Sequence, residues 1–383
     1  MSEYQYYEWQ THERPLTAAE QNAVDALSSH IDVTASQAIV TYNWGDFKHD
    51  PLDVLAKYFD AYLYLANWGT RHLAFRFPKG LLDAAAIDAT YCDEEFLHIK
   101  TIGDVHILEF EMNEDEGFDE WLEERGLLST LARLRDDILQ GDYRALYIGW
   151  LKAMSERSEY DDEDEDDPEN FFNDPEPPQP AGLKKLTPPL EALIDFLEID
   201  PFLVAAAAER SPNLLPLKEQ DFAPLISRLT RQECDDFLLK IVHAEPGAVA
   251  ALRKRLLSVE QPKPTAQTAP RTIGELLEIA ENLGEAEAHR QIEENRKRHI
   301  AAMQELAKRE TQIWQDVERT LASGYSAANY DHATDLLNQL HQLAEFQGTP
   351  AKFDTKLGAL VEKYKSRSAL GSAQEGSDSL EMS

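Results

Sequence analysis

The sequence predicts an α+β N-terminal domain followed by all-α helical domains joined by disordered linkers. Three observations predict this organisation: strand and helix patterns alternate up to about residue 156, helical patterns alone occur after about residue 183, and two polar proline-bearing stretches separate these parts. The expected segments are an α+β domain at 1–156, an acidic disordered linker at 157–182, a small helical domain at 183–259, a linker at 260–272, a coiled-coil-like helical bundle at 273–367 and a disordered tail at 368–383.

The front domain is expected to hold about five strands, mostly antiparallel. Three of them are predicted by aromatic and β-branched residues, in "EYQYYEW" at 3–9, "QAIVTYNW" at 37–44 and "HLAFRF" at 72–77.

The clearest β-pattern is "EFLHIKTIGDVHILEFEM" at 95–112, which predicts a hairpin with Gly103-Asp104 as its two-residue loop. In this register Ile99 faces Leu108 and Leu97 faces Phe110, and these four residues form the core side. The other side of the hairpin then carries His98, Lys100, Ile107 and Glu109.

Helix starts in the front domain are predicted by capping residues. Thr17 and Glu20 form a capping-box pattern, so a helix begins near residue 18. Asp50-Pro51 opens "PLDVLAKYFDAYLYLA", whose apolar residues recur at steps of three and four and predict one helix over 51–66. A short helix in "LLDAAAIDATY" and helices at about 118–139 and 142–155 complete the domain.

The later helices have equally readable limits. Asp200-Pro201 starts one helix, and Thr230 with Glu233 caps another. The third part begins with a capping pair at Thr272 and Glu275 and continues into a long charged helix, followed by helices near 329–346 and 350–366. The long helix exceeds what two shorter helices can cover, so we expect its first turns to project, to pack on another domain or to bind a partner chain.

Composition favours a cytoplasmic protein without bound cofactors. The net charge of −34 disfavours nucleic acid and membrane surfaces as direct partners. Only two cysteines occur, Cys92 and Cys234, which make neither a disulfide framework nor a zinc site. We expect no metal and no cofactor, because the sequence holds no glycine-rich phosphate loop, paired-histidine metal motif or EF-hand loop.

The triplet Asn43-Trp44-Gly45 returns as Asn67-Trp68-Gly69, one on each side of the helix predicted over 51–66. Two interpretations are open. The preferred one is that each indole seals one end of that helix, with glycine at the chain reversal. In the other interpretation Trp44 and Trp68 together form an exposed aromatic surface that binds a peptide or a base. These two tryptophans are the binding candidates.

Catalytic candidates are sparse, and no catalytic residue is assigned. His98 opposite Glu109, with Lys100 nearby, resembles a general acid–base pair, and it also resembles an ordinary cross-strand surface pair. His72 lies beside Arg71 and before Arg76, which suggests either a small anion-binding spot or solvated face residues.

Several phrases carry a family resemblance: "YNWGDFK", "YLANWGTR" and "RKRHIAAMQELAKRETQIWQDVE" with "YDHATDLLNQL". The chain resembles, over most of its length, a group of bacterial proteins of unknown function. The resemblance implies a bacterial, cytoplasmic protein, and it implies no activity, ligand or site residue.

Together these observations favour a non-enzymatic scaffold or accessory subunit of a bacterial cytoplasmic assembly. Its protein partners are expected to bind residues 273–367 and the acidic linker, and the oligomeric state is not specified by the sequence. The alternatives are an enzyme with its site near His98, Glu109 and His72, and a regulator of a nucleic-acid machine that acts through its acidic segment.

Overall fold

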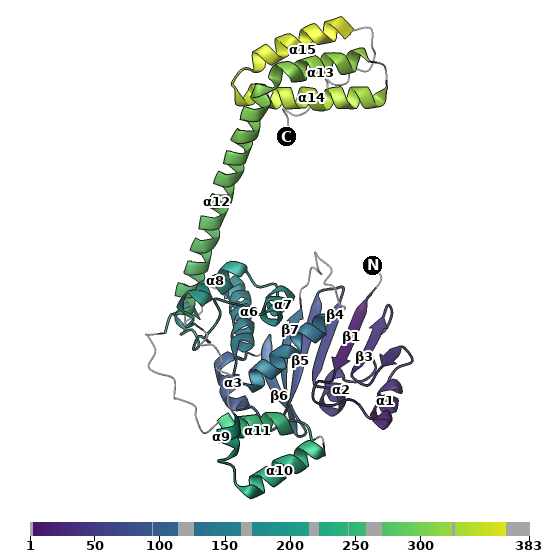
Figure 1. Cartoon of the computed structure of the whole chain (residues 1–383), viewed down its shortest axis with the longest axis vertical. Helices are drawn as coiled ribbons and strands as arrows, with labels where there is room; N and C mark the ends of the chain where they lie inside the picture. Colours follow the sequence, from purple (N-terminus) through teal and green to yellow (C-terminus); the bar gives the residue numbers. More distant parts are fainter. Residues whose placement is uncertain are drawn as a thin grey trace. The chain divides into compact units, whose positions relative to one another are not determined.

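A computed structural model describes residues 3–93, 95–113, 126–161, 171–213, 222–243, 245–257, 270–323 and 326–364 (Figure 1). The chain divides into an N-terminal unit, Met1–Gly284, and a C-terminal unit, Glu285–Ser383. Three folded parts are expected from the sequence instead, and the boundaries of these parts remain predictions. No helix of the described residues combines the length and the apolar character needed to cross a membrane.

The N-terminal unit is built on a seven-stranded antiparallel sheet with the order β2-β3-β1-β4-β5-β7-β6 (Figure 1). An antiparallel sheet with helices, followed by mostly helical structure, confirms the coarse fold class, whereas the expected count of about five strands is wrong. The strands are β1 Gln5–Gln10, β2 Ile31–Val33, β3 Gln37–Tyr42, β4 Ala61–Ala66, β5 Thr70–Pro78, β6 Leu97–Ile102 and β7 Val105–Asn113.

The helix predicted over 51–66 is a helix followed by a strand. Helix α2 spans Pro51–Tyr58, and its end is followed by β4. Five of the six residues of β4 are buried, so the strand lacks the alternation of a half-exposed strand and its apolar residues resemble a helical stripe. Asp60, buried between the two elements, accepts hydrogen bonds from the backbone N–H groups of His12 (2.7 Å) and Glu13 (3.0 Å). The loop that donates these hydrogen bonds is far from Asp60 in the sequence, so the residues around Asp60 do not predict them.

Several local predictions are confirmed. The β6–β7 hairpin pairs Leu97 with Phe110 and Ile99 with Leu108. Capping boxes open helix α1, Ala18–Asp25, at Thr17 and helix α10, Arg231–Val242, at Thr230. The side chain of Asp50 caps α2 by accepting from the backbone N–H of Leu52 at 2.8 Å.

The two faces of the sheet belong to different cores. One core contains Trp9, Tyr62 and Ile107 together with residues of α1 and α2. The other contains Leu63, Phe75 and Phe110 and is covered by helices that follow the sheet in sequence. Those helices are α3 Ala84–Tyr91, α4 Leu127–Leu131, α5 Arg133–Leu139, α6 Arg144–Asp161, α7 Pro188–Phe196, α8 Pro201–Arg210 and the first turns of α12, Ile273–Lys308.

The described end of the expected acidic linker packs into this second core. Phe171, in the 3-10 helix η1 (Phe171–Asn173), is 3% exposed, and Pro175 forms a β-bridge with Thr272. Glu176 and Arg271 form an ion pair at 2.8 Å with both side chains buried. Prolines keep this segment extended whether or not it packs on other residues. Here Thr272 pairs with its backbone, and Arg271 neutralises the charge of Glu176. Other parts of the expected linkers and the whole expected tail, at 162–170, 260–269 and 368–383, lie outside the described residues.

Helices α9 (Phe222–Ile226), α10 and α11 (Ala248–Leu257) form a small helical group in the N-terminal unit. Helix α11 and Gly247, the residue before it, are attached to the sheet domain through three hydrogen bonds. The backbone N–H of Gly247 donates to Glu13, and Lys254 Nζ donates to the carbonyls of Gly80 (3.0 Å) and Leu81 (2.9 Å).

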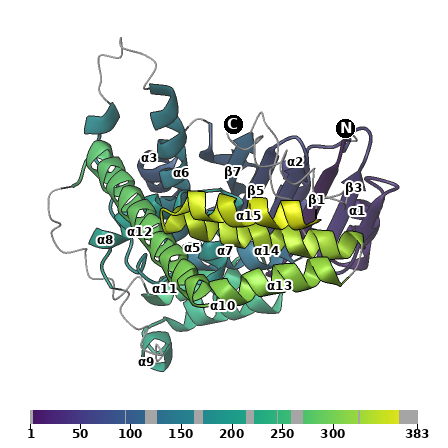
Figure 2. The same cartoon turned by 90° about the horizontal axis from the view of Figure 1, so that it is seen from above.

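In the C-terminal unit, α13 (Glu310–Ala322), α14 (Ala327–Phe346) and α15 (Pro350–Tyr364) lie side by side (Figure 2). Their core includes Val317, Leu340 and Phe353. The long charged helix expected from the sequence is interrupted at Arg309, because α12 ends at Lys308 and α13 begins at Glu310.

Candidate functional site

The two tryptophans of the repeated triplet are exposed. Trp44 is 75% exposed and Trp68 is 41% exposed, so the expectation that both indoles seal a helix is wrong. The physical reason lies in the topology. Each triplet follows a strand, β3 or β4, and the helix between them ends at Tyr58.

The topology places both triplets at the same end of the sheet. Strands β3 and β4 flank β1, and Gln5 at the start of β1 pairs with Tyr42 on one side and with Ala66 on the other. Both strands run antiparallel to β1, so both end where β1 begins, at the end of the sheet where the N-terminus lies (Figure 1).

Side-chain hydrogen bonds hold both loops against the start of β1. Gln5 Nε2 donates to the carbonyl of Gly45 at 3.0 Å and to Asp46 Oδ1 at 2.9 Å. The backbone N–H of Tyr4 donates to Asn67 Oδ1 at 2.9 Å. Gly45 and Gly69 have φ values of 78° and 107°, which explains why each triplet ends in glycine.

Two tyrosines on the same face of the sheet as Gln5 hold its side-chain amide in place. The hydroxyls of Tyr7 and Tyr64 donate to Gln5 Oε1 at 2.6 Å and 3.0 Å. Burial raises the pKa of both phenols, so both remain donors at neutral pH. The position of the Gly45 loop therefore depends on a chain of hydrogen bonds that begins in the sheet.

The second candidate cluster surrounds Glu109, which is 1% exposed. Its carboxylate lies 2.9 Å from Lys100 Nζ, 3.0 Å from His72 Nε2 and 3.7 Å from His98 Nε2. The structure thus brings His98, Glu109, Lys100 and His72 together, as the hairpin register predicts for three of them; His72 comes from the neighbouring strand β5.

The electrostatics of this cluster favour the charged carboxylate. Burial raises the pKa of Glu109, but the hydrogen bond with His72 and the nearby side chains of His98 and Lys100 outweigh burial, so its pKa lies below the ordinary value. The Glu109 carboxylate, 3.7 Å from His98 Nε2, raises the pKa of His98, with burial acting against it. Such a pair can hold or transfer a proton near neutral pH.

The expected anion spot of His72 with Arg71 and Arg76 does not form. Arg71 points to the opposite face of β5, where its buried guanidinium donates to the carbonyl of Phe196 at 2.7 Å. Arg76 pairs with Asp60 at 2.5 Å. Strand alternation separates Arg71 from His72, and a carboxylate of the sheet domain already neutralises Arg76.

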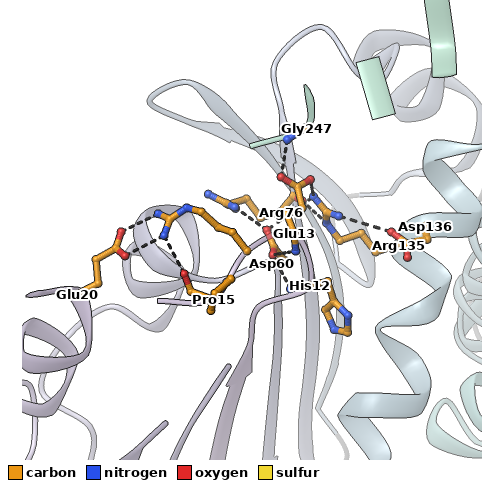
Figure 3. A network of polar contacts seen from close by, with 10 residues as sticks. His12, Glu13, Pro15, Glu20, Asp60, Arg76, Arg135, Asp136 and Gly247 are labelled. Atoms are coloured by element: carbon orange, nitrogen blue, oxygen red, sulfur yellow. Dashed lines mark hydrogen bonds and ion pairs between the residues drawn. The ribbon is translucent and has the colours of Figure 1, made fainter. Parts of the chain in front are cut away.

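A third cluster, which sequence reasoning missed, joins Asp60 to two arginines (Figure 3). Arg135 is 1% exposed; its Nε donates to the carbonyl of Arg76 at 2.7 Å, and its Nη2 donates to Glu13 Oε1 at 2.6 Å. Burial raises the pKa of Asp60, but Arg135, Arg76 and two backbone N–H groups outweigh it and lower the pKa. These residues are far apart in sequence, and no motif connects them.

A pocket of about 750 Å³ opens beside this third cluster. Its walls come from α5, α11 and the loops at 12–13 and 81–83, and they include the side chains of His12, Tyr143 and Arg253. Burial lowers the pKa of His12, so its imidazole is neutral at pH 7. Neither Glu109 nor any of its three partners lines this pocket.

Exposed apolar side chains gather on the α9–α11 group. We call the following set the α9–α11 apolar surface: Ile226, Leu238, Leu239, Ile241, Val242 and Val249, with exposures between 38% and 77%. None of the residues of α10 is buried. In the described part of the C-terminal unit, only Ile292 and Phe346 are large, apolar and exposed to a comparable degree.

Among the described residues, no group of three His, Cys, Asp or Glu side chains is arranged to hold a metal ion. Both cysteines are free, and burial raises the pKa of Cys92 to about 12, so its thiol stays protonated.

Comparisons of this chain with protein-family models, with curated proteins and with solved structures found no match.

Proposed function

We propose that this chain is a non-enzymatic scaffold or accessory subunit of a bacterial cytoplasmic assembly and that the α9–α11 apolar surface binds a partner protein. The observation that carries the proposal is the concentration of six exposed apolar side chains on one short helical group. Soluble proteins rarely expose contiguous apolar patches without a binding role.

The energetics favour a partner that covers α10. Val242 is 77% exposed, and Leu238 and Leu239 are 58% and 57% exposed. Burying one such side chain contributes about 1.5–3 kcal/mol. Three neighbouring side chains can therefore supply much of the free energy of a micromolar complex, about 8 kcal/mol.

Residues 273–367, the partner-binding segment expected from the sequence, supply a second surface in this proposal. Helix α12 is exposed and charged over 285–299 and carries short-range ion pairs, such as Glu287–Arg290 at 2.7 Å. A helix of this kind interacts through charge more than through apolar burial. The partner contacts of α12 should therefore weaken with salt, and those of α10 should not.

The test compares Val242→Glu with Ile292→Glu, a matched control in which the exposed apolar residue lies on α12. Each variant is expressed at native level in the source bacterium, and its complexes are measured by affinity purification and light scattering. We expect Val242→Glu to weaken retention of a stoichiometric partner at least about tenfold, because a charge then enters an apolar contact.

Equal retention by wild type and Val242→Glu contradicts the proposed surface. Loss of the partner only with Ile292→Glu would place the contact on α12. A monomeric wild-type protein with no stoichiometric partner contradicts the scaffold role itself.

A second candidate function is an enzyme with its site at Glu109, supported by the contact of His72 and His98 with one buried carboxylate. The test is activity against a broad substrate panel, with His98→Ala as the variant. His106→Ala is the control, because His106 lies on the same hairpin and bonds Thr101 instead, at 3.0 Å. Activity that survives His98→Ala contradicts this candidate.

A third proposal, regulation of a nucleic-acid machine by the acidic segment, depends on carboxylates at 162–170, outside the described residues. Its test must delete only those residues, because Phe171 and Glu176 belong to the core.

A further inference from the structure

The pocket beside the third cluster lies between two parts of the N-terminal unit. Helix α5 and the loop at 81–83 supply one side of it, and the start of α11 supplies the other. Its volume of about 750 Å³ falls within the range of about 300–1,000 Å³ that is usual for small-molecule sites. The pocket is therefore large enough to enclose a ligand of one or more rings.

The two sides of the pocket are held together without a ligand. Glu13 accepts a hydrogen bond from the backbone N–H of Gly247, and Lys254 Nζ donates to the carbonyls of Gly80 and Leu81. Gly247 has a φ of 77°, and a Cβ at this position would lie 2.6 Å from Leu81 Cδ1. Glycine therefore allows the start of α11 to approach the loop closely. A ligand would enter a pocket whose walls are already in place, so little ordering opposes its binding.

Apolar side chains form much of the lining. Leu81, Leu82 and Ile138 all line the pocket and are at most 9% exposed. Tyr143 adds an aromatic ring, which packs at 6.3 Å from the ring of Tyr91. Such a lining favours a ligand with an apolar body, and an aromatic body can also pack against the tyrosine ring.

The charges around the pocket favour an uncharged ligand. Three cationic side chains and four carboxylates line it, so their formal charges nearly cancel. Glu13 and Arg135 already pair at 2.6 Å, and the side chain of Asp136 is 62% exposed. Arg253 and Glu245 are both exposed and opposite in sign. A charged ligand would lose hydration in this pocket without gaining a buried, unpaired partner of opposite charge.

Two uncharged polar groups of the lining can bond a ligand. The hydroxyl of Tyr143 and the imidazole of His12 have no hydrogen-bond partner among the described residues. The ring of His12 extends away from the ion pairs of the third cluster (Figure 3). Burial and the nearby Asp83 carboxylate raise the pKa of Tyr143, and burial lowers the pKa of His12, so both groups are neutral at pH 7. A phenol and a neutral imidazole can each donate and accept, and a hydroxyl group of a ligand can pair with either.

We propose that this pocket binds a small, uncharged aromatic molecule that carries a hydroxyl group, with the Tyr143 hydroxyl and the His12 imidazole as its hydrogen-bond partners. Ile241 and Val249 line the pocket and also belong to the α9–α11 apolar surface. The proposal does not depend on a partner protein, and its test separates the pocket from that surface.

The test is equilibrium dialysis of the full-length protein against 2-naphthol at pH 7.5. We expect saturable binding of one molecule per chain. The charged analogues 2-naphthoate and 2-naphthylmethylammonium should bind with a Kd at least about tenfold higher, because each must leave part of its hydration shell to enter the pocket.

Two variants change the pocket itself. Ala250→Trp should raise the Kd for 2-naphthol at least about tenfold, because Ala250 lines the pocket and an indole at this position occupies the space of the ligand. Tyr143→Phe removes a single oxygen atom and should raise the Kd about three- to tenfold, which corresponds to one neutral hydrogen bond. Tyr58→Phe is the matched control, because Tyr58 is a half-buried tyrosine that does not line the pocket, and it should leave the Kd unchanged.

The proposal is overturned if 2-naphthol shows no saturable binding, if Tyr143→Phe binds like wild type, or if either charged analogue binds as tightly as 2-naphthol. Val242→Glu should leave the Kd unchanged, because Val242 does not line the pocket. Loss of 2-naphthol with Val242→Glu but not with Ala250→Trp would place the ligand on the α9–α11 apolar surface and overturn the proposal. Thermal midpoints show whether each variant folds, and Tyr143→Phe decides the test if Ala250→Trp does not.

Discussion

Asp60 and Glu109 are two carboxylates of the N-terminal unit that are each 1% exposed, and their clusters neutralise them with different chemistry. Asp60 is held by Arg76, Arg135 and backbone N–H groups, whereas Glu109 is held by His72, His98 and Lys100. Arginine stays charged at every accessible pH, but histidine titrates near neutrality. The Asp60 cluster is therefore suited to a structural role, and the Glu109 cluster can respond to pH.

The side chains that neutralise Asp60 are also more deeply buried than those that neutralise Glu109. The side chain of Arg135 is 1% exposed, whereas the partners of Glu109 are between 15% and 44% exposed. Solvent screens the partners of Glu109 and leaves those of Asp60 in a low-dielectric setting. Loss of a partner should accordingly cost more free energy at Asp60 than at Glu109, and three experiments test that ranking.

The largest effect is expected for Arg135→Met. This change leaves Glu13 without its cation and weakens the compensation of Asp60, so the free energy of unfolding should fall by about 3–5 kcal/mol in denaturant titrations. Arg133→Met is the control, because Arg133 is exposed on the same helix and should change stability by less than about 0.5 kcal/mol. Equal effects of the two variants would show that the Asp60 cluster contributes no special stability.

For Glu109→Gln we expect the free energy of unfolding to fall by less, about 1–3 kcal/mol. The neutral amide pairs poorly with His72, His98 and Lys100, but water can partly hydrate these side chains. Glu111→Gln, on the same face of β7, should be near neutral in the same titration. If Glu109→Gln destabilises the protein more than Arg135→Met, the ranking of the two clusters is reversed.

The smallest expected effect is the change with pH in the stability that His98 contributes. Because the folded pKa of His98 is raised, its contribution is complete below the unfolded value of about 6.5 and disappears as pH rises through the folded pKa. The stability difference between wild type and His98→Gln should therefore shrink between pH 6 and pH 9, by less than about 1 kcal/mol.

The Arg135→Met difference should stay constant between pH 7.5 and pH 9, because arginine does not titrate there and the pKa of Asp60 is lowered. At lower pH His12 also contributes, since the charge of Arg135 helps to lower its pKa. A His98 difference that grows with pH would contradict the assigned direction of the shift. An Arg135 difference that changes between pH 7.5 and pH 9 would contradict the structural role assigned to the Asp60 cluster.

The candidate sites differ in how many of their residues could be predicted from the sequence. The β6–β7 register follows from two-residue alternation and a two-residue loop, so it correctly placed His98 and Glu109 on one face. The addition of His72 required the pairing of β5 with β7, which sequence patterns do not specify. Arg135 and Asp60 meet only through tertiary packing, and no spacing in the sequence relates them.

The sequence by itself determined the features that depend on neighbouring residues: the capping boxes at Thr17 and Thr230, the hairpin at 97–113 and the glycine that ends each tryptophan triplet. The tertiary structure alone decided that β4 is a strand and that Trp44 and Trp68 are exposed at one end of the sheet. The physical reason is that caps and turns are satisfied by atoms a few residues away. The burial of a strand or an indole depends on which distant segments cover it.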